Sequence, residues 1–207
     1  MFVAGTLRGC TIVLDVDEQG CLPGWRLRRA GGVGPSGAGG GQGGGCGAAN
    51  MNPATQIVRS GHATAVARAV ALIEQKYTAK VVPLRVSAPF HCALMRPVAD
   101  ELKEAFAQIE WHDPKFPIIA NATALPVQKA QAVREALYAQ TYSPVLWSQS
   151  VLEMEKNGVD GYIELGPGSV LSGLVRKICN GKRPYAVSNS QELLAAADYL
   201  RSGGNAR

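Results

Sequence analysis

The 207-residue sequence lacks long apolar runs and any sign of an export signal. None of its hydrophobic stretches approaches the roughly 18 consecutive residues that a membrane-spanning helix needs. Its first residues also lack the basic and apolar regions of a secretory signal. Because 46% of the residues are hydrophobic, which is typical of globular proteins, the chain can bury a core. We therefore expect a soluble protein of the cytoplasm that does not bind membranes.

Paired cysteines and clustered positive charge are missing as well. The cysteines are five, an odd number, and none forms a C-x-x-C pair, so we expect reduced thiols and neither a disulfide framework nor a metal site. The 21 Lys and Arg against 16 Asp and Glu leave a net charge of +5. The basic residues do not cluster with aromatic ones as they do in nucleic-acid-binding proteins. We therefore expect no nucleic-acid partner.

Glycine is distributed very unevenly along the chain. Of the 24 glycines, 11 lie within residues 31–47, a density that neither a helix nor a packed strand tolerates, because glycine costs backbone entropy and buries no side chain. We therefore predict that residues 1–47 form a Gly-rich, irregular segment that is disordered or aberrant, with one plausible strand at 11–14. Its composition is also typical of GC-rich DNA read in a shifted frame, which translation of the upstream DNA would test.

From residue 48 onward, strand and helix patterns alternate. Helical spacing of apolar residues is found at 62–77, 94–109, 132–140, 144–154 and 170–178. Short strand patterns are found at 56–58, 80–86, 116–120 and 161–165. Pro97 falls in the first turn of the second helix, and Gly158 ends the fourth. The alternation predicts an α/β fold with some parallel strand pairing.

Residues 86–95 contain the first candidate site residue, His91. It follows a predicted strand and precedes an amphipathic helix, the position in α/β proteins where catalytic groups gather. The titration range of histidine suits proton transfer. From spacing alone, a histidine that caps the helix or fills a gap is the more common alternative. The neighbouring Cys92 is better interpreted as a small buried side chain than as a nucleophile.

Two further motifs resemble known sites but lack their full pattern. Residues 164–169 form a Gly-Pro-Gly turn before a helix, where free backbone N–H groups could bind a phosphate or an oxyanion. The turn lacks the spacing of a P-loop or of G-x-G-x-x-G, so we expect a tight strand-to-helix connection. Ser36 lies in a segment similar to a G-x-S-x-G elbow, but Ala38 replaces the last glycine and no strand precedes it. We therefore exclude Ser36 as a nucleophile.

Four ordered blocks between residues 49 and 178 resemble malonyl-CoA:acyl carrier protein transacylases and the acyltransferase domains of polyketide synthases. The blocks are 50–62, 86–95, 142–147 and 164–168. The resemblance implies a carboxy-terminal fragment with a partial α/β-hydrolase-like acyltransferase core and the remnant of a ferredoxin-like small subdomain. The implied boundaries are 48–90 for the second half of the small subdomain, 91–180 for the core and 181–207 for a tail.

The same resemblance implies a set of site residues. His91 matches the general base that activates a serine, and the backbone carbonyl of Gln140 matches the group that orients it. Phe90 matches an aromatic residue common in malonyl-selective members, and Asn52 matches an asparagine near the cleft, although residues 53–55 depart from the usual Ser-Pro-Gly. The implied substrates are malonyl-CoA and phosphopantetheinyl acyl carrier protein, with no bound cofactor and a ping-pong mechanism.

Three parts of the family pattern are absent from these 207 residues. They are the G-Q-G-S-Q segment, the G-H-S-x-G elbow and the arginine that pairs with the malonyl carboxylate. Without a serine and oxyanion donors, His91 cannot supply the usual rate, so we expect this chain to be inactive alone. Two alternatives stay open, a non-catalytic carrier-protein-binding module and a half-enzyme whose serine comes from another chain. The pathway, fatty-acid or polyketide synthesis, is open too.

Overall fold

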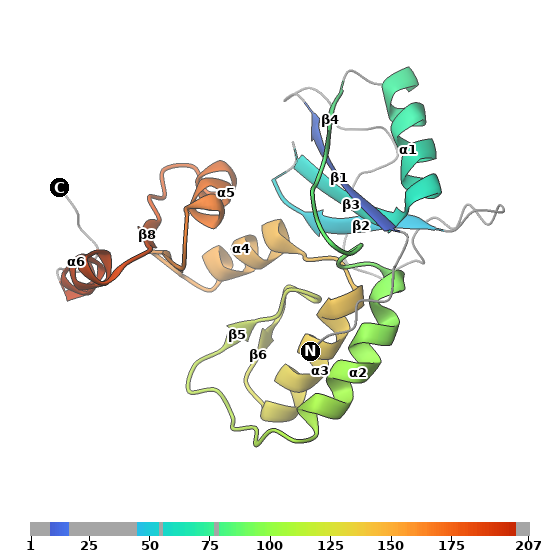
Figure 1. The fold of residues 1–207 in the computed structure, drawn as a ribbon. Helices are drawn as coiled ribbons and strands as arrows, with labels where there is room; N and C mark the ends of the chain where they lie inside the picture. Colours follow the sequence, from blue (N-terminus) through green and yellow to red (C-terminus); the bar gives the residue numbers. More distant parts are fainter. Residues whose placement is uncertain (1–8, 17–44, 54–55, 77–78, 202–207) are drawn as a thin grey trace. The chain divides into compact units, whose positions relative to one another are not determined.

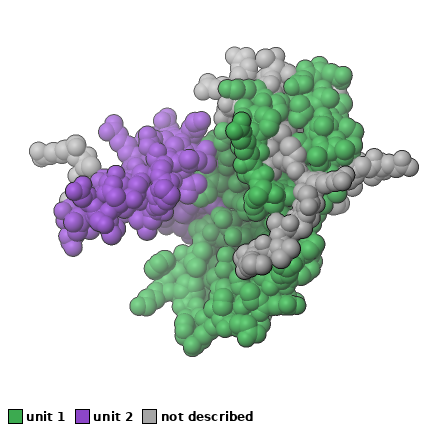
Figure 2. Space-filling model, viewed as in Figure 1, with its two compact units in different colours: residues 1–147 green, residues 148–207 purple. Residues whose placement is uncertain are grey.

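The computed structural model describes residues 9–16, 45–53, 56–76 and 79–201 of the chain (Figure 1). The chain divides into two compact units, residues 1–147 and residues 148–207 (Figure 2). Both contain helices and strands, which agrees with the predicted α/β class. Within the described ranges, every helix is too short or too polar to cross a membrane.

The first unit begins with a four-stranded antiparallel sheet. Its strands are β1 (Gly9–Val16), β2 (Cys46–Met51), β3 (Gln56–His62) and β4 (Ala79–Pro83), in the order β2-β3-β1-β4. Helix α1 (Ala63–Lys76) lies against this sheet (Figure 1), which confirms the helix predicted over 62–77. It buries Val66 and Ile73 in a cluster with Val81 of β4, so burial of its apolar face holds it in place.

The sequence predicts that residues 1–47 are irregular apart from one strand at 11–14; that strand is confirmed within β1, and the start of β2 is a second, unexpected strand. Strand β1 pairs with β3 on one side and with β4 on the other, and Leu14 lies opposite both Ile57 and Val81. β2 begins at Cys46, inside the predicted segment. The Gly-density argument concerned 31–47, whereas residues 11–14 include β-branched types that favour strands. Residues 1–8 and 17–44 lie outside the described residues.

A pair of helices and a short hairpin complete the first unit. The elements are η1 (Ala93–Met95), α2 (Arg96–Phe106), β5 (Ile118–Ile119), β6 (Pro126–Val127) and α3 (Ala130–Tyr142). Helices α2 and α3 lie side by side (Figure 1). The Tyr138 hydroxyl donates to Asp100 at 2.7 Å, and the Arg96 guanidinium lies 4.2 Å from the centre of the Tyr142 ring. Pro97 occupies the first turn of α2, as predicted.

Backbone hydrogen bonds join the sheet to the segment that follows α3. The Met51 N–H donates to the Val145 carbonyl, and the Val145 N–H donates to the Ala49 carbonyl, both at 2.8 Å. Ala49 and Val145 are both buried, so these bonds are shielded from competition with water. Strand β2 therefore fixes the position at which the chain leaves α3.

In its described residues, 148–201, the second unit contains a small parallel sheet and three helices. The elements are α4 (Trp147–Lys156, of which all but the first residue belong to this unit), β7 (Ile163–Leu165), α5 (Val170–Ile178), β8 (Tyr185–Val187) and α6 (Ser190–Arg201). β7 and β8 are parallel, which confirms the parallel pairing that the alternation of elements predicts.

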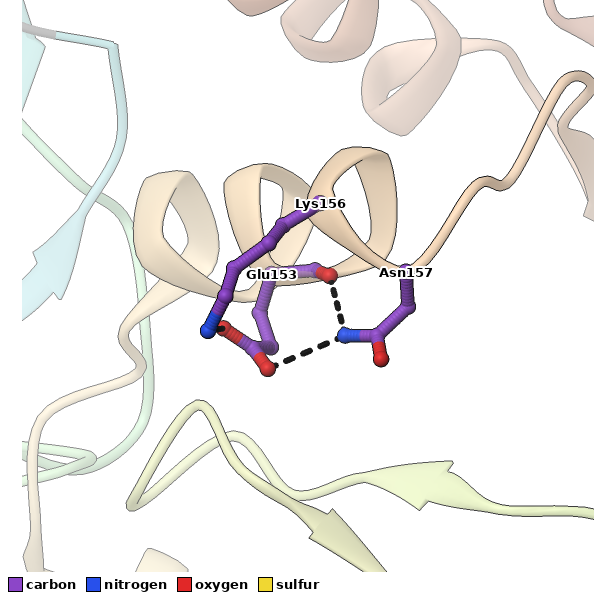
Figure 3. A network of polar contacts seen from close by, with 3 residues as sticks. All are labelled: Glu153, Lys156 and Asn157. Carbon is purple, nitrogen blue, oxygen red and sulfur yellow. Dashed lines mark hydrogen bonds and ion pairs between the residues drawn. The ribbon is translucent and has the colours of Figure 1, made fainter.

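Helix α4 ends where the sequence predicts a glycine stop. Gly158 has a φ of 81°, a conformation that glycine adopts without strain. The Asn157 side-chain amide donates to the Glu153 carbonyl oxygen at 2.7 Å and to its carboxylate at 3.0 Å. Lys156 adds an ion pair with Glu153 at 3.5 Å, and the three side chains form a network at the helix end (Figure 3).

The segment predicted as a carboxy-terminal tail, 181–207, contains two elements that the sequence did not predict, β8 and α6. A strand of three residues is too short to show a reliable period in the sequence. It forms here because β7 offers a parallel partner, with Ile163 opposite Tyr185 and Leu165 opposite Val187. In α6, Ala196 is buried. Residues 202–207 lie outside the described residues.

Candidate functional site

His91 lies in a turn between β4 and η1 and has an uncommon backbone conformation. Its φ is 59°, a value that few non-glycine residues adopt. The Phe90 N–H donates to the Ala88 carbonyl at 3.0 Å, and the Met95 N–H donates to the Cys92 carbonyl at 2.9 Å. The turn before η1 thus has hydrogen bonds on both sides of His91.

The His91 ring is bound to the end of α3. Its Nδ1 atom lies 2.9 Å from the backbone carbonyl oxygen of Gln140. In a continued helix this carbonyl would accept from the N–H four residues later, but that residue is Pro144, which has no N–H. The Gln140 carbonyl is therefore available to a side chain.

The bond to Gln140 determines which nitrogen of His91 carries the proton. A carbonyl oxygen can only accept, so Nδ1 must donate whenever the imidazole is neutral. The lone pair then lies on Nε2, which is left to accept a proton from a reacting group. This is the arrangement that a general base requires.

The other two predicted site residues lie in different surroundings. Phe90 directly precedes His91 and is 42% exposed, so its ring is open to a ligand. Asn52 follows β2, and its side-chain amide donates at 2.9 Å to the Oε1 atom of Gln56, the first residue of β3. The structure thus brings His91 and Gln140 together and joins Asn52 to Gln56 of the sheet, while Phe90 is the residue before His91 in the chain.

Cys92 has the surroundings of a structural thiol. It is buried, and its Sγ donates to the Pro89 carbonyl at 3.0 Å. Burial raises the pKa of the Cys92 thiol, while hydrogen bonds around the sulfur oppose part of the rise. A thiol with a raised pKa is a poor nucleophile at neutral pH, which agrees with the interpretation of Cys92 from the sequence.

The Gly-Pro-Gly turn connects β7 to α5 and is closed by the chain's own carboxylate. Gly166 and Gly168 have φ values of 134° and 93°. Glu164 accepts from the Leu171 N–H at 3.1 Å and from the Ser172 N–H at 2.7 Å. These donors at the start of α5 are therefore not free for a phosphate. The expected strand-to-helix connection is confirmed.

Sequence reasoning missed one signal and left two histidines without a role. The missed signal is Pro144, which lies four residues after Gln140 and frees its carbonyl. His62 ends β3, and the exposed His112 lies 3.5 Å from Glu110. No cluster of three or more His, Cys, Asp or Glu suited to a metal ion occurs in the described part of the chain.

Two curated proteins similar to this chain share one name. No family model matches the chain. It is 38% identical over 149 residues to the malonyl CoA-acyl carrier protein transacylase of Escherichia coli K12, covering 72% of this chain and 48% of that protein. It is 38% identical over 153 residues to the transacylase of Bacillus subtilis 168, covering 74% and 48%. The chain spans about half the length of these curated relatives.

Solved structures give the same relationship. An acyl carrier protein S-malonyltransferase from Vibrio cholerae matches with a TM-score of 0.75 and 32% identity, covering 94% of this chain and 60% of that one. A malonyl-transacylase in complex with its type II polyketide synthase acyl-carrier protein matches with a TM-score of 0.76 and 32% identity, with the same coverage. The likeness thus extends over nearly the whole chain.

Proposed function

We propose that this chain contributes the catalytic histidine of an acyl-transfer site. The chain belongs to the malonyl CoA-acyl carrier protein transacylase family and matches about half the length of its curated relatives. The hydrogen bond from His91 Nδ1 to the Gln140 carbonyl carries this proposal. It leaves Nε2 as the proton acceptor, so His91 is the general base and Gln140 orients it through its backbone.

The proposed reaction also needs a nucleophilic serine. The family motif that carries it, G-H-S-x-G, is absent from these 207 residues, so the serine must come from outside them. Nε2 accepts the serine hydroxyl proton as the serine oxygen attacks the malonyl thioester carbonyl. The carbon–sulfur bond then breaks, and the coenzyme A sulfur leaves with the proton from the imidazolium. In the second half, Nε2 accepts the proton of the carrier-protein phosphopantetheine thiol as its sulfur attacks the acyl-serine ester carbonyl. The carbon–oxygen bond then breaks, and the serine oxygen leaves with the proton from the imidazolium.

Two predicted binding residues fit this proposal in different ways. The exposed Phe90 ring, beside His91, is proposed to contact the acyl group. Asn52 is proposed to lie near the cleft, where its bond to Gln56 joins it to the start of β3. Ser–His chemistry needs no resident cofactor.

The finer architecture is part of the same proposal. The four-stranded sheet with α1 is proposed to be the ferredoxin-like small subdomain, and its antiparallel strand order β2-β3-β1-β4 supports this. That assignment extends the small subdomain to β1, beyond the 48–90 boundary expected from the sequence. Residues 91–180, with β8 and α6, are proposed to form part of an α/β-hydrolase-like acyltransferase core.

The second unit supports the expectation that the chain is inactive alone. Parallel strands are normally covered on both faces, and sheets of two strands have little stability by themselves. Here β7 and β8 are the two strands of their sheet, and Leu165 and Val170 are 72% and 73% exposed. Such surfaces call for further polypeptide, which in the relatives would also supply the serine.

Reconstitution tests the proposed function. The chain is mixed with the part of a curated relative that it does not match, which the family pattern predicts to carry the G-H-S-x-G serine. We expect malonyl transfer from malonyl-CoA to phosphopantetheinyl acyl carrier protein, measured by intact-protein mass spectrometry, only when both parts are present. Robust transfer by this chain alone would contradict the proposal. Carrier-protein binding without transfer by the mixture would favour the alternative of a non-catalytic binding module.

A further inference from the structure

The conformation of His91 requires support from the residues around it. A positive φ in a non-glycine residue is unfavourable in isolation, and it persists only when neighbouring contacts stabilise it. The bond to Gln140 holds the ring but joins His91 to a different element, 49 residues away in the chain. Local contacts must therefore hold the backbone of the turn.

The Cys92 side chain supplies such a contact. Cys92 is 8% exposed, and its Sγ lies 3.0 Å from the Pro89 carbonyl oxygen, so this bond spans Phe90 and His91. Pro89 is among the most deeply buried residues of the chain. On the other side, the Cys92 carbonyl accepts from the Met95 N–H at the start of the helical segment. The thiol thus closes a loop that contains the exposed Phe90 and the half-buried His91.

The chemical state of the thiol suits this role. Burial raises the pKa of Cys92, so at neutral pH the sulfur keeps its proton and can donate it to a carbonyl. Ser60 of β3, which is fully buried, contributes a hydrogen bond to the sulfur. This bond links the turn to β3, so we expect a substitution at Cys92 to alter the conformation of the turn.

We propose that Cys92 is a positioning residue for His91. The Cys92 thiol donates to the Pro89 carbonyl and holds the turn in the conformation that directs the His91 imidazole to Gln140. The consequence for acyl transfer rests on the proposed role of His91 as base. The positioning of the His91 ring does not rest on that role, because it concerns only the geometry of this chain without substrate. Two substitutions separate the effect of the hydrogen bond from that of side-chain volume. Cys92→Ser keeps a hydrogen-bond donor, and Cys92→Val keeps a similar volume without a donor.

The test measures exchange of the His91 Nδ1 proton with water by NMR in the full chain. Cys92 has an extended backbone (φ −139°, ψ 171°) that accepts a β-branched residue. We expect exchange to be about tenfold faster in Cys92→Val, the factor for loss of one hydrogen bond, and within about twofold of the wild-type rate in Cys92→Ser. Cys179→Val, which replaces another buried thiol in the second unit, is the matched control and should leave the exchange unchanged.

The outcomes distinguish positioning from general stability. Equal exchange in Cys92→Val and the wild-type chain would overturn the proposal, as would equal acceleration by Cys179→Val. If near-ultraviolet circular dichroism shows that Cys92→Val does not fold, Cys92→Ala is compared with Cys92→Ser, and equal rates in these two overturn it. In the reconstituted enzyme, Cys92→Val should lower kcat with little change in KM. Failure of reconstitution would contradict the proposed function and leave the exchange result standing.

Discussion

Replacing His91 by alanine is expected to lower malonyl transfer by the reconstituted enzyme by about 10²–10⁴-fold, the range for loss of a general base. The variant removes Nε2, the nitrogen that the Gln140 bond leaves free to accept a proton. The serine hydroxyl would then have to ionise without a base, and the pantetheine thiol would lose its proton acceptor in the second half-reaction. In the proposed reaction both steps depend on the same nitrogen, so we expect neither product to accumulate.

A matched histidine variant serves as the control. His112 is exposed and lies near Glu110 on the surface, so His112→Ala should leave transfer unchanged. Acyl-enzyme formation and transfer to the carrier protein are followed separately by quenched-flow mass spectrometry. Retention of more than about a tenth of wild-type transfer by His91→Ala would show that the base is elsewhere.

Replacing Glu164 by alanine is expected to lower the free energy of unfolding by about 2 kcal/mol, within the range for hydrogen bonds to a charged acceptor. The carboxylate accepts from two N–H groups at the start of α5, at 3.1 and 2.7 Å, and joins that helix to the end of β7. Alanine would leave both donors without this partner. Urea unfolding monitored by circular dichroism measures the change, and Glu101→Ala, an exposed residue of α2, is the control.

The stabilisation of the fold by Glu164 is expected to weaken at low pH. Burial alone would raise the pKa of Glu164, but hydrogen bonds from Ser172 and Leu171 outweigh it and lower the pKa. A carboxyl whose pKa is lower in the folded chain stabilises the fold above its unfolded pKa of about 4.3, and this contribution is lost as the pH falls through the folded pKa. The stability difference between wild-type and Glu164→Gln chains should therefore be full at pH 6.5 and shrink below pH 4.

Most helices are accessible from the sequence, because their apolar residues recur at helical spacing, but α6 is missed. The α5 prediction agrees with the observed Val170–Ile178 at both ends, and α1 differs from its prediction by one residue at each end. The strand predicted at 11–14 lies within β1, but the full length of β1 and the whole of β8 are not evident from the sequence, since a strand's stability depends on partners distant in the sequence. For β1 these partners are β3 and β4, and for β8 the partner is β7.

The candidate site shows the same division between local and distant signals. The turn position of His91 before a helix was visible in the sequence, and so was the buried character of Cys92. The contact between His91 and Gln140 joins residues 49 positions apart, which spacing alone cannot predict; only the family resemblance indicated it. Pro144 offered a physical clue, because a proline just after a helix leaves a carbonyl without its helical donor.

The tautomer of His91 tests the central claim most directly. Long-range proton–nitrogen NMR spectra of the full chain, labelled with nitrogen-15, report which ring nitrogen carries the proton. We predict a single neutral form of His91, with the proton on Nδ1 and the lone pair on Nε2. A neutral form protonated at Nε2, or a mixture that exchanges rapidly between the two, would show that the Gln140 carbonyl does not hold the ring, and the base that the proposed reaction requires would be absent.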